Sequence, residues 1–232
     1  MKIGLLSDIH SRDAALEWAL GQLADVEAVF NLGDTVGYKG DVNRCFELLN
    51  ARGVVNLAGN HDLEALEEDD PDSDIAFFDG DGNFMAPDFG LQDEYKSQIR
   101  EMRREIREVI DRQPFFFAHE FCVDPKKSHS VTITSRNVQE LLAHAGNRCC
   151  FLGGNHQWEL FVVAPRGGGV EHEEITESRR IAMEPDKAYV LYVGSTAIPS
   201  YCIVDTENES IDIVIETSGG GQSGLWPPPC AR

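Results

Sequence analysis

Apolar positions in the first part of the chain alternate between short continuous runs and runs with helical spacing. Continuous runs at residues 2–7, 27–32 and 54–58 are typical of short buried strands. Residues 13–23 and 41–51 between them carry apolar side chains at helical spacing. Strands that alternate with helices in this way predict a parallel sheet covered by helices.

The second half of the chain is predicted to be richer in strands. Short apolar runs, many of them β-branched, predict strands at residues 115–118, 131–134, 149–152, 159–163, 188–193, 200–204 and 211–215. An apolar stripe predicts a helix over residues 93–112, and a second helix is expected at 137–145. Two sheets packed face to face, with helices outside, would accommodate this pattern.

We expect one domain over residues 1–217, with an insertion at 63–113 and a flexible tail at 218–232. The insertion consists of an acidic loop followed by the predicted helix. Residues 64–81 hold nine acidic side chains and no basic one, which favours a mobile, solvated loop near the mouth of the site. The tail contains Gly and Pro runs and lacks any periodicity.

Polar side chains follow each of the three strands predicted in the first part of the chain. In chain order they are Asp8 and His10, then Asp34, then Asn60, His61 and Asp62. Because the carboxyl ends of neighbouring parallel strands meet at one crevice, these side chains are expected to converge. Carboxylates, imidazoles and a carboxamide form a ligand set suited to Mn, Fe, Zn or Mg, so the sequence predicts a metal site.

The spacing of these residues resembles the calcineurin-like metallophosphoesterases, whose blocks read D-x-H, G-D, G-N-H-[DE], a later His, and G-H-x-H. The first three blocks are intact, and His119 follows the predicted strand 115–118 where the fourth block falls. The fifth block departs from the pattern, because Gly154 stands where the family has its first His and His156 matches the second. The resemblance covers residues 1 to about 216 and is greatest with the small, single-domain bacterial and archaeal branch. It implies an α/β fold, a four-layer α/β/β/α sandwich in which two mixed sheets pack face to face with helices outside.

The resemblance also implies two divalent ions, drawn from Mn, Fe, Zn, Ni or Mg with Mn favoured, and hydrolysis of a phosphate ester by a metal-activated water. Metal one would be held by Asp8, His10, Asp34 and His156. Metal two would be held by Asp34, Asn60 and His119, with the Asp34 carboxylate as the bridge. His61 would protonate the leaving oxygen, and Asp62 would orient it. Imidazole suits this task because it exchanges protons near neutral pH.

Two alternatives stay open at the altered fifth block. If the block is read one residue later, Asn155 and Gln157 take the two His positions and His156 is not a ligand. Glu120, which follows His119 where the family usually has Gly, could supply a carboxylate to metal two or point outward. A catalytically weakened relative, which binds a phosphorylated ligand or a single metal without efficient turnover, is the alternative function.

The formal net charge of −20 arises from 40 acidic and 20 basic residues. Such a surface repels phosphate backbones, so a small phosphorylated substrate is expected and nucleic acid is disfavoured. Six cysteines without C-x-x-C spacing give little support for a zinc–thiolate site. The sequence shows neither a signal peptide nor a membrane-spanning run, so we expect a cytoplasmic protein with no membrane partner. It indicates no oligomeric state.

Overall fold

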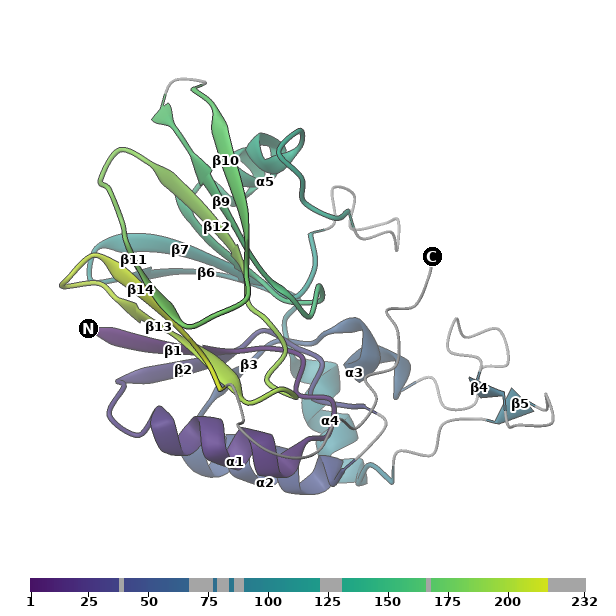
Figure 1. Ribbon diagram of the computed structural model, residues 1–232. Coiled ribbons are helices and arrows are strands. Elements are labelled where there is room, and N and C mark those ends of the chain that lie inside the picture. The colour runs from purple at the N-terminus through teal and green to yellow at the C-terminus, as the bar shows by residue number, and fades with distance from the viewer. Residues whose placement is uncertain are drawn as a thin grey trace.

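Two mixed sheets of six strands each pack face to face in the computed structural model (Figure 1). The structure describes residues 1–37, 40–66, 90–121, 131–165 and 168–216, together with the backbone of 77–78 and 84–85. The predicted tail at 218–232 and most of the acidic segment at 64–81 lie outside the described residues. The α/β sandwich expected from the sequence is confirmed.

The first sheet carries the three parallel strands predicted in the first part of the chain. Its strand order is β11 (Arg179–Ala182), β14 (Ser210–Ile215), β13 (Ser200–Asp205), β1 (Lys2–Leu6), β2 (Ala28–Asn31) and β3 (Val55–Asn56). Strands β1, β2 and β3 are parallel to one another, whereas β13 pairs with β1 in the antiparallel sense. The carboxyl ends of β1, β2 and β3 therefore lie at one edge of the molecule.

The second sheet is also mixed, and its centre is parallel. Its strand order is β10 (Val170–Ile175), β9 (Trp158–Val163), β12 (Ala188–Tyr192), β8 (Cys149–Leu152), β7 (Gln113–Ala118) and β6 (Glu105–Ile110). Strand β8 runs parallel to both β7 and β12, and the remaining pairs are antiparallel. The ends of β7 and β8 thus bring two further loops to one place.

Helices cover the outer faces of both sheets (Figure 1). Helices α1 (Asp13–Gln22) and α2 (Val42–Arg52) pack on the first sheet, and α5 (Val138–Ala145) packs on the second. The remaining elements are α3 (Asn60–Glu64), α4 (Asp93–Glu101) and a two-stranded ribbon of β4 (Phe77–Phe78) and β5 (Phe84–Met85). None of the helices in the described part of the chain has the length and apolar content needed to cross a bilayer.

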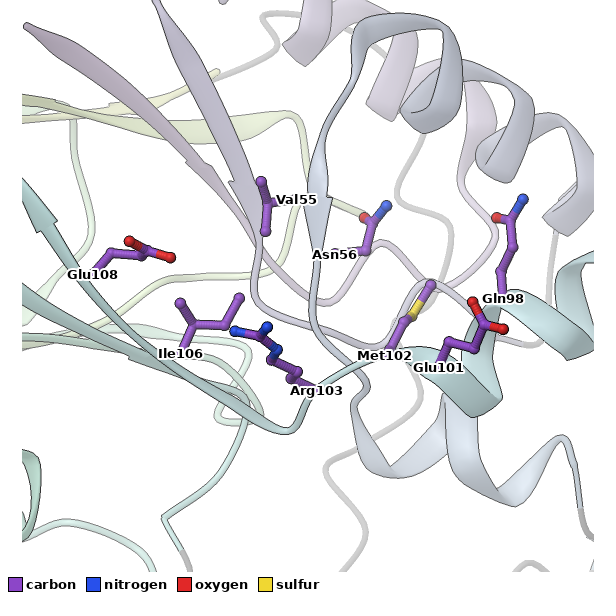
Figure 2. A pocket seen from close by; sticks show the side chains of 8 residues that line it. All are labelled: Val55, Asn56, Gln98, Glu101, Met102, Arg103, Ile106 and Glu108. Atoms are coloured by element: carbon purple, nitrogen blue, oxygen red, sulfur yellow. The ribbon is translucent and has the colours of Figure 1, made fainter.

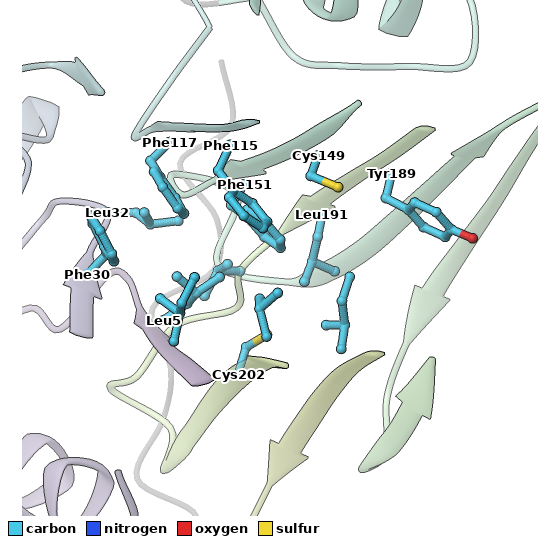
Figure 3. Close-up of a cluster of buried hydrophobic side chains, with 14 of the residues drawn as sticks. Leu5, Phe30, Leu32, Phe115, Phe117, Cys149, Phe151, Tyr189, Leu191 and Cys202 are labelled. Carbon is cyan, nitrogen blue, oxygen red and sulfur yellow. The ribbon is translucent and has the colours of Figure 1, made fainter. Parts of the chain in front are cut away.

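The largest apolar cluster lies between the two sheets (Figure 3). Phe30 of the first sheet stacks on Phe117 of the second, with ring centroids 4.5 Å apart. Phe151, which is also fully buried, stacks on Phe117 from the neighbouring strand at 5.7 Å. Burial of such rings stabilises the sandwich and holds the ends of β2, β7 and β8 close together.

The helix predicted over residues 93–112 is wrong in its second half. Helix α4 ends at Glu101, and residues 105–110 form β6, which pairs with β7. Asp111 and Arg112 join these strands with φ angles of 49° and 65°, the left-handed conformation that a tight hairpin turn requires. The predicted stripe did not distinguish the two structures, because Ile106 and Ile110 share a face in a strand as well as in a helix.

The other differences from the prediction concern one predicted strand that is absent and elements that were not predicted. Residues 131–134 are not a strand: the Val131 N–H donates to the Phe121 carbonyl, and the Ile133 N–H donates to the Tyr192 hydroxyl. Strands β10 and β11 were not predicted, because they form sheet edges with mostly exposed, charged side chains. The short helix α3 was also missed.

Candidate functional site

The polar side chains that the sequence singles out lie in the loops after β1, β2, β3, β7 and β8. In this order these connections hold Asp8 and His10, Asp34, Asn60 (the first residue of α3), His119 and His156. Backbone hydrogen bonds extend the pairing of the first two loops, with Asp8 N–H donating to the Gly33 carbonyl and His10 N–H to the Asp34 carbonyl, both at 3.0 Å. Both sheets therefore contribute to one group of side chains.

Several of these residues adopt the left-handed backbone conformation. The φ angles are 53° at Asp8, 48° at His10, 55° at Asp34 and 60° at His156. An L-residue in this region is strained by roughly 1–3 kcal/mol, and such strain concentrates at functional sites. The loop conformations therefore direct side chains into the crevice at a cost in stability.

Four side chains form the first group of candidate ligands: Asp8, His10, Asp34 and His156. One ligand atom from each lies within 4.8 Å of the others. The Nε2 of His156 is 3.1 Å from Oδ1 of Asp8 and 3.1 Å from Nε2 of His10. The Nε2 of His10 lies 3.9 Å from Oδ2 of Asp34. The structure thus brings together the four residues that the family resemblance assigns to metal one.

A second group shares the Asp34 carboxylate. The Nε2 of His119 lies 3.3 Å from Oδ2 of Asp34 and 3.2 Å from Oδ1 of Asn60. The other ring nitrogen of His119 is 3.0 Å from the Leu32 carbonyl, which fixes the ring orientation. Asp34 Oδ2 therefore lies between the two groups, where a bridging ligand would be needed.

The donor types and their separations fit divalent ions. Two ligand atoms that bind one ion at about 2.1 Å lie about 3 Å apart, which matches the 3.1–3.3 Å contacts in both groups. Carboxylate, imidazole and amide donors without thiolate are typical of Mn, Fe, Zn or Mg sites. The residues present therefore fit metal binding.

In the metal-free chain, the buried carboxylates and imidazoles stabilise one another's charged forms. Burial alone would raise the pKa of Asp34, but the neighbouring His119 holds it well below its usual value. Burial disfavours a charged His119, yet the Asp34 carboxylate outweighs this and raises the pKa of His119 to about 10. Burial would also raise the pKa of Asp8, but the hydrogen bond from His156 and the charges of His119 and His156 together lower it. In the metal-free chain the two carboxylates are therefore balanced by protonated histidines, whose positive charge a bound cation would replace.

The side chain of His61 faces both the shared carboxylate and a residue of its own helix. Its Nε2 lies 3.9 Å from Oδ2 of Asp34, and its ring meets the His10 ring edge-on at 5.0 Å. Its Nδ1 lies 3.6 Å from Oε2 of Glu64. The imidazole thus borders the crevice without occupying the positions of the candidate ligands.

Asp62 differs from the expectation that it orients His61. Its Oδ2 accepts hydrogen bonds from the backbone N–H groups of Asp34 and Gly59, and its Oδ1 accepts one from Val36. Burial and the charge of Asp34 raise the pKa of Asp62 to about 6, against the effect of these donors. Asp62 therefore ties the loop after β2, which carries Asp34, to the loop after β3.

The loop after β8 distinguishes the two readings of the altered block. A Cβ on Gly154 would lie 3.4 Å from Nε2 of His119 and 3.3 Å from Cγ of Glu120. Asn155 donates its side-chain N–H to Glu159 and is not part of either ligand group, and Gln157 is exposed. The structure therefore places Gly154, rather than Asn155, beside the second group, and Glu120 next to the space that a side chain at 154 would fill.

Two cavities accompany this arrangement. A small one of about 50 Å³ adjoins the second group and is lined by Glu120, Gly154 and Tyr192, among others. A larger one of about 450 Å³ opens between the edge strands β3 and β6, with Val55, Arg103 and Ile106 in its wall (Figure 2). None of the candidate ligands lines the larger cavity, so it does not adjoin either ligand group.

Residues 1–209 match the calcineurin-like phosphoesterase superfamily domain. The chain belongs to this superfamily. Membership covers most of the chain and includes every loop that carries a candidate ligand, so the protein is a phosphoesterase by family. Metal-dependent hydrolysis of phosphate esters is the general activity that the family and the Asp–His cluster support.

This phosphoesterase is similar to other proteins at low sequence identity. An uncharacterised protein of Methanocaldococcus jannaschii is 27% identical over 223 residues, covering 91% of this chain and 86% of that protein. A metallophosphoesterase from Sphaerobacter thermophilus has a TM-score of 0.66 at 19% identity, covering 93% of this chain and 88% of its own. An archaeal phosphodiesterase has a TM-score of 0.50 at 19% identity, covering 93% and 100%. At such identity the two solved structures show the common fold.

The sequence prediction overlooked Glu64. It lies three residues after His61, so the two side chains share a face of α3. Burial raises the pKa of Glu64 more than the facing His61 and Asn60 lower it. The spacing of Glu64 from His61 was the available signal in the sequence, but the prediction placed Glu64 in the acidic loop.

Proposed function

We propose that this phosphoesterase hydrolyses a small phosphodiester or phosphomonoester at a site that holds two divalent ions. The observation that carries the proposal is the position of Asp34. Its Oδ2 lies 3.3 Å from His119, 3.9 Å from His10 and 3.9 Å from His61. One carboxylate oxygen thus joins both ligand groups and faces the imidazole proposed as general acid.

Asp8, His10, Asp34 and His156 would hold the first ion, and Asp34, Asn60 and His119 the second. When bound, such ions neutralise phosphate oxygens and lower the pKa of an attacking water. Mn²⁺ is the ion we favour, since the donors are carboxylate, imidazole and amide. His61 is proposed to donate its Nε2 proton to the leaving oxygen. Asp62 holds the Asp34 loop in place through its three backbone hydrogen bonds.

The second site is proposed to bind its ion more weakly than the first. It has three protein donors, because Gly154 offers no side chain beside His119. Glu120, whose Cγ lies 3.3 Å from the Cβ position of residue 154, is the carboxylate nearest to that space and could complete the coordination. If neither Glu120 nor substrate does so, the alternative function applies: binding of a phosphorylated ligand, or of one metal, without efficient turnover.

A small substrate agrees with the charge of the protein. The net charge of −20 disfavours long nucleic acids, whereas bound ions would supply positive potential at the crevice alone. The fold shared with an archaeal phosphodiesterase makes a diester the first substrate to test. A cytoplasmic location stays part of this proposal.

The test is hydrolysis of p-nitrophenyl phosphate and bis-p-nitrophenyl phosphate after chelation and after addition of Mn²⁺, Mg²⁺ or Zn²⁺. We expect no turnover in chelated protein, recovery with Mn²⁺, and two metals per chain at high free metal. Asp34→Asn should abolish turnover and the second metal, while Asp25→Asn, an exposed control, should change neither. Turnover in metal-free protein would contradict the mechanism. Metal binding without any hydrolysis would favour the alternative function.

A further inference from the structure

Helix α3 places a candidate ligand, the proposed acid and a carboxylate on one short turn. Glu64 follows His61 by three residues and Asn60 by four, so its side chain is a neighbour of both on the helix surface. Oε2 of Glu64 is 3.6 Å from Nδ1 of His61. Among the described residues, this buried oxygen has no hydrogen-bond donor at bonding distance. This oxygen is therefore available to accept a hydrogen bond from the imidazole N–H of His61.

The two ring nitrogens of His61 face different partners. Nε2 points toward Oδ2 of Asp34 at 3.9 Å, and Nδ1 points toward Glu64. Asp62, the neighbour expected to orient the ring, has both oxygens engaged with backbone N–H groups. Rotation of the ring about χ2 would turn Nε2 away from the leaving oxygen, and a contact at Nδ1 would oppose that rotation.

We propose that Glu64 is a positioning residue for His61. It accepts a hydrogen bond from Nδ1–H, which fixes the ring and leaves Nε2–H directed into the crevice. As the bond between phosphorus and the leaving oxygen breaks, the Nε2 proton passes to that oxygen, and Glu64 gains no proton. A separation of 3.6 Å exceeds a hydrogen bond, but catalytic hydrogen bonds are often long in the free enzyme and shorten on substrate binding. The inference rests on the proposed function for its catalytic consequence.

The experiment compares Glu64→Gln with Glu47→Gln, an exposed control whose carboxylate also pairs within its own helix, with Arg44 at 3.0 Å. For a poor leaving group such as an alkoxide, Glu64→Gln should lower kcat by about 10–100-fold, part of the 10²–10⁴-fold ascribed to a general acid. For p-nitrophenolate, which needs no proton, the loss should be small, and KM and the content of the first metal, whose ligands Glu64 does not contact, should not change. In the His61→Ala background, Glu64→Gln should have no further effect. Equal losses for both leaving groups, or a further loss without His61, would overturn the proposal.

A second measurement separates this inference from the proposed function. If the metal-loaded wild type hydrolyses no ester, the proposed function fails. The contact between Glu64 and His61 is then tested by ¹⁵N NMR of histidine-labelled, Mg²⁺-loaded protein. We expect the His61 Nδ1 signal to shift in Glu64→Gln and to stay unchanged in Glu47→Gln. An identical His61 signal in wild type and Glu64→Gln would show that the carboxylate does not hold the ring.

Discussion

Replacing Gly154 with histidine tests whether the second ligand group lacks one donor. A Cβ at this position would lie 3.4 Å from Nε2 of His119 and 3.3 Å from the Glu120 side chain. The Cβ would also lie 3.3 Å from the backbone carbonyl oxygen of His119. The flexible Glu120 side chain can move by a few tenths of an ångström, whereas the contact with the backbone adds to the strain. A histidine here would start beside the ligand atom of His119, so its ring can reach the same ion.

The strain and the added donor have opposite effects on stability. Gly154 has a φ of 76°, where a side chain costs about 1–2 kcal/mol. For a domain of this size that strain lowers Tm by about 2–8 °C in metal-free protein. One more donor should raise second-site affinity by about 10–100-fold, which corresponds to about 1.4–2.8 kcal/mol. With metal present, the added binding should therefore offset the strain.

Gly154→Ala is the matched control, because it carries the strain without the donor. Calorimetric titration with Mn²⁺, with metal counted by mass spectrometry, should show two metals per chain at lower free metal for Gly154→His than for wild type. Gly154→Ala should bind metal as wild type does and lose Tm. If the His and Ala variants titrate alike while Asn155→Ala or Gln157→Ala removes a metal, the reasoning is refuted and the later register is correct.

Two further outcomes are expected. His61→Ala should lower kcat by about 10²–10⁴-fold and leave metal content unchanged, with a smaller loss for p-nitrophenyl esters; loss of metal would show that His61 is a ligand. Metal binding near pH 7.5 should release a proton, because a bound histidine must be neutral and the pKa of His119 is raised to about 10 in the metal-free chain. The stability that this charged histidine gives to metal-free protein should be present below its ordinary pKa of 6.5 and be lost as pH rises toward 10. Urea unfolding in chelator from pH 6 to 10 measures this, and the same slope in His119→Gln would contradict it.

Local sequence was sufficient for the alternation of strands and helices and for the polar residues at strand ends, and the family resemblance supplied the four-layer arrangement and the ligand roles. Strands β1, β2, β7 and β8 are fully buried along most of their length, so each reads as a continuous apolar run. The polar residues that follow such runs stand out, and parallel strands bring their ends together. Asp8, Asp34 and His119 could be found for this reason.

Only the tertiary structure decided which side chains touch. Residues 105–110 became β6 because β7 offered a partner through the turn at 111–112, a pairing that helical spacing could not exclude. The family resemblance assigned Asp62 to His61, yet its carboxylate accepts hydrogen bonds from backbone N–H groups of two loops, those after β2 and β3. Glu64 faces His61 through helical geometry, and Gly154 lies beside His119 because β7 and β8 are neighbours. Sequence determines the kinds of side chain at a strand end, whereas contacts between loops depend on strand order and register, which form only when distant segments pack.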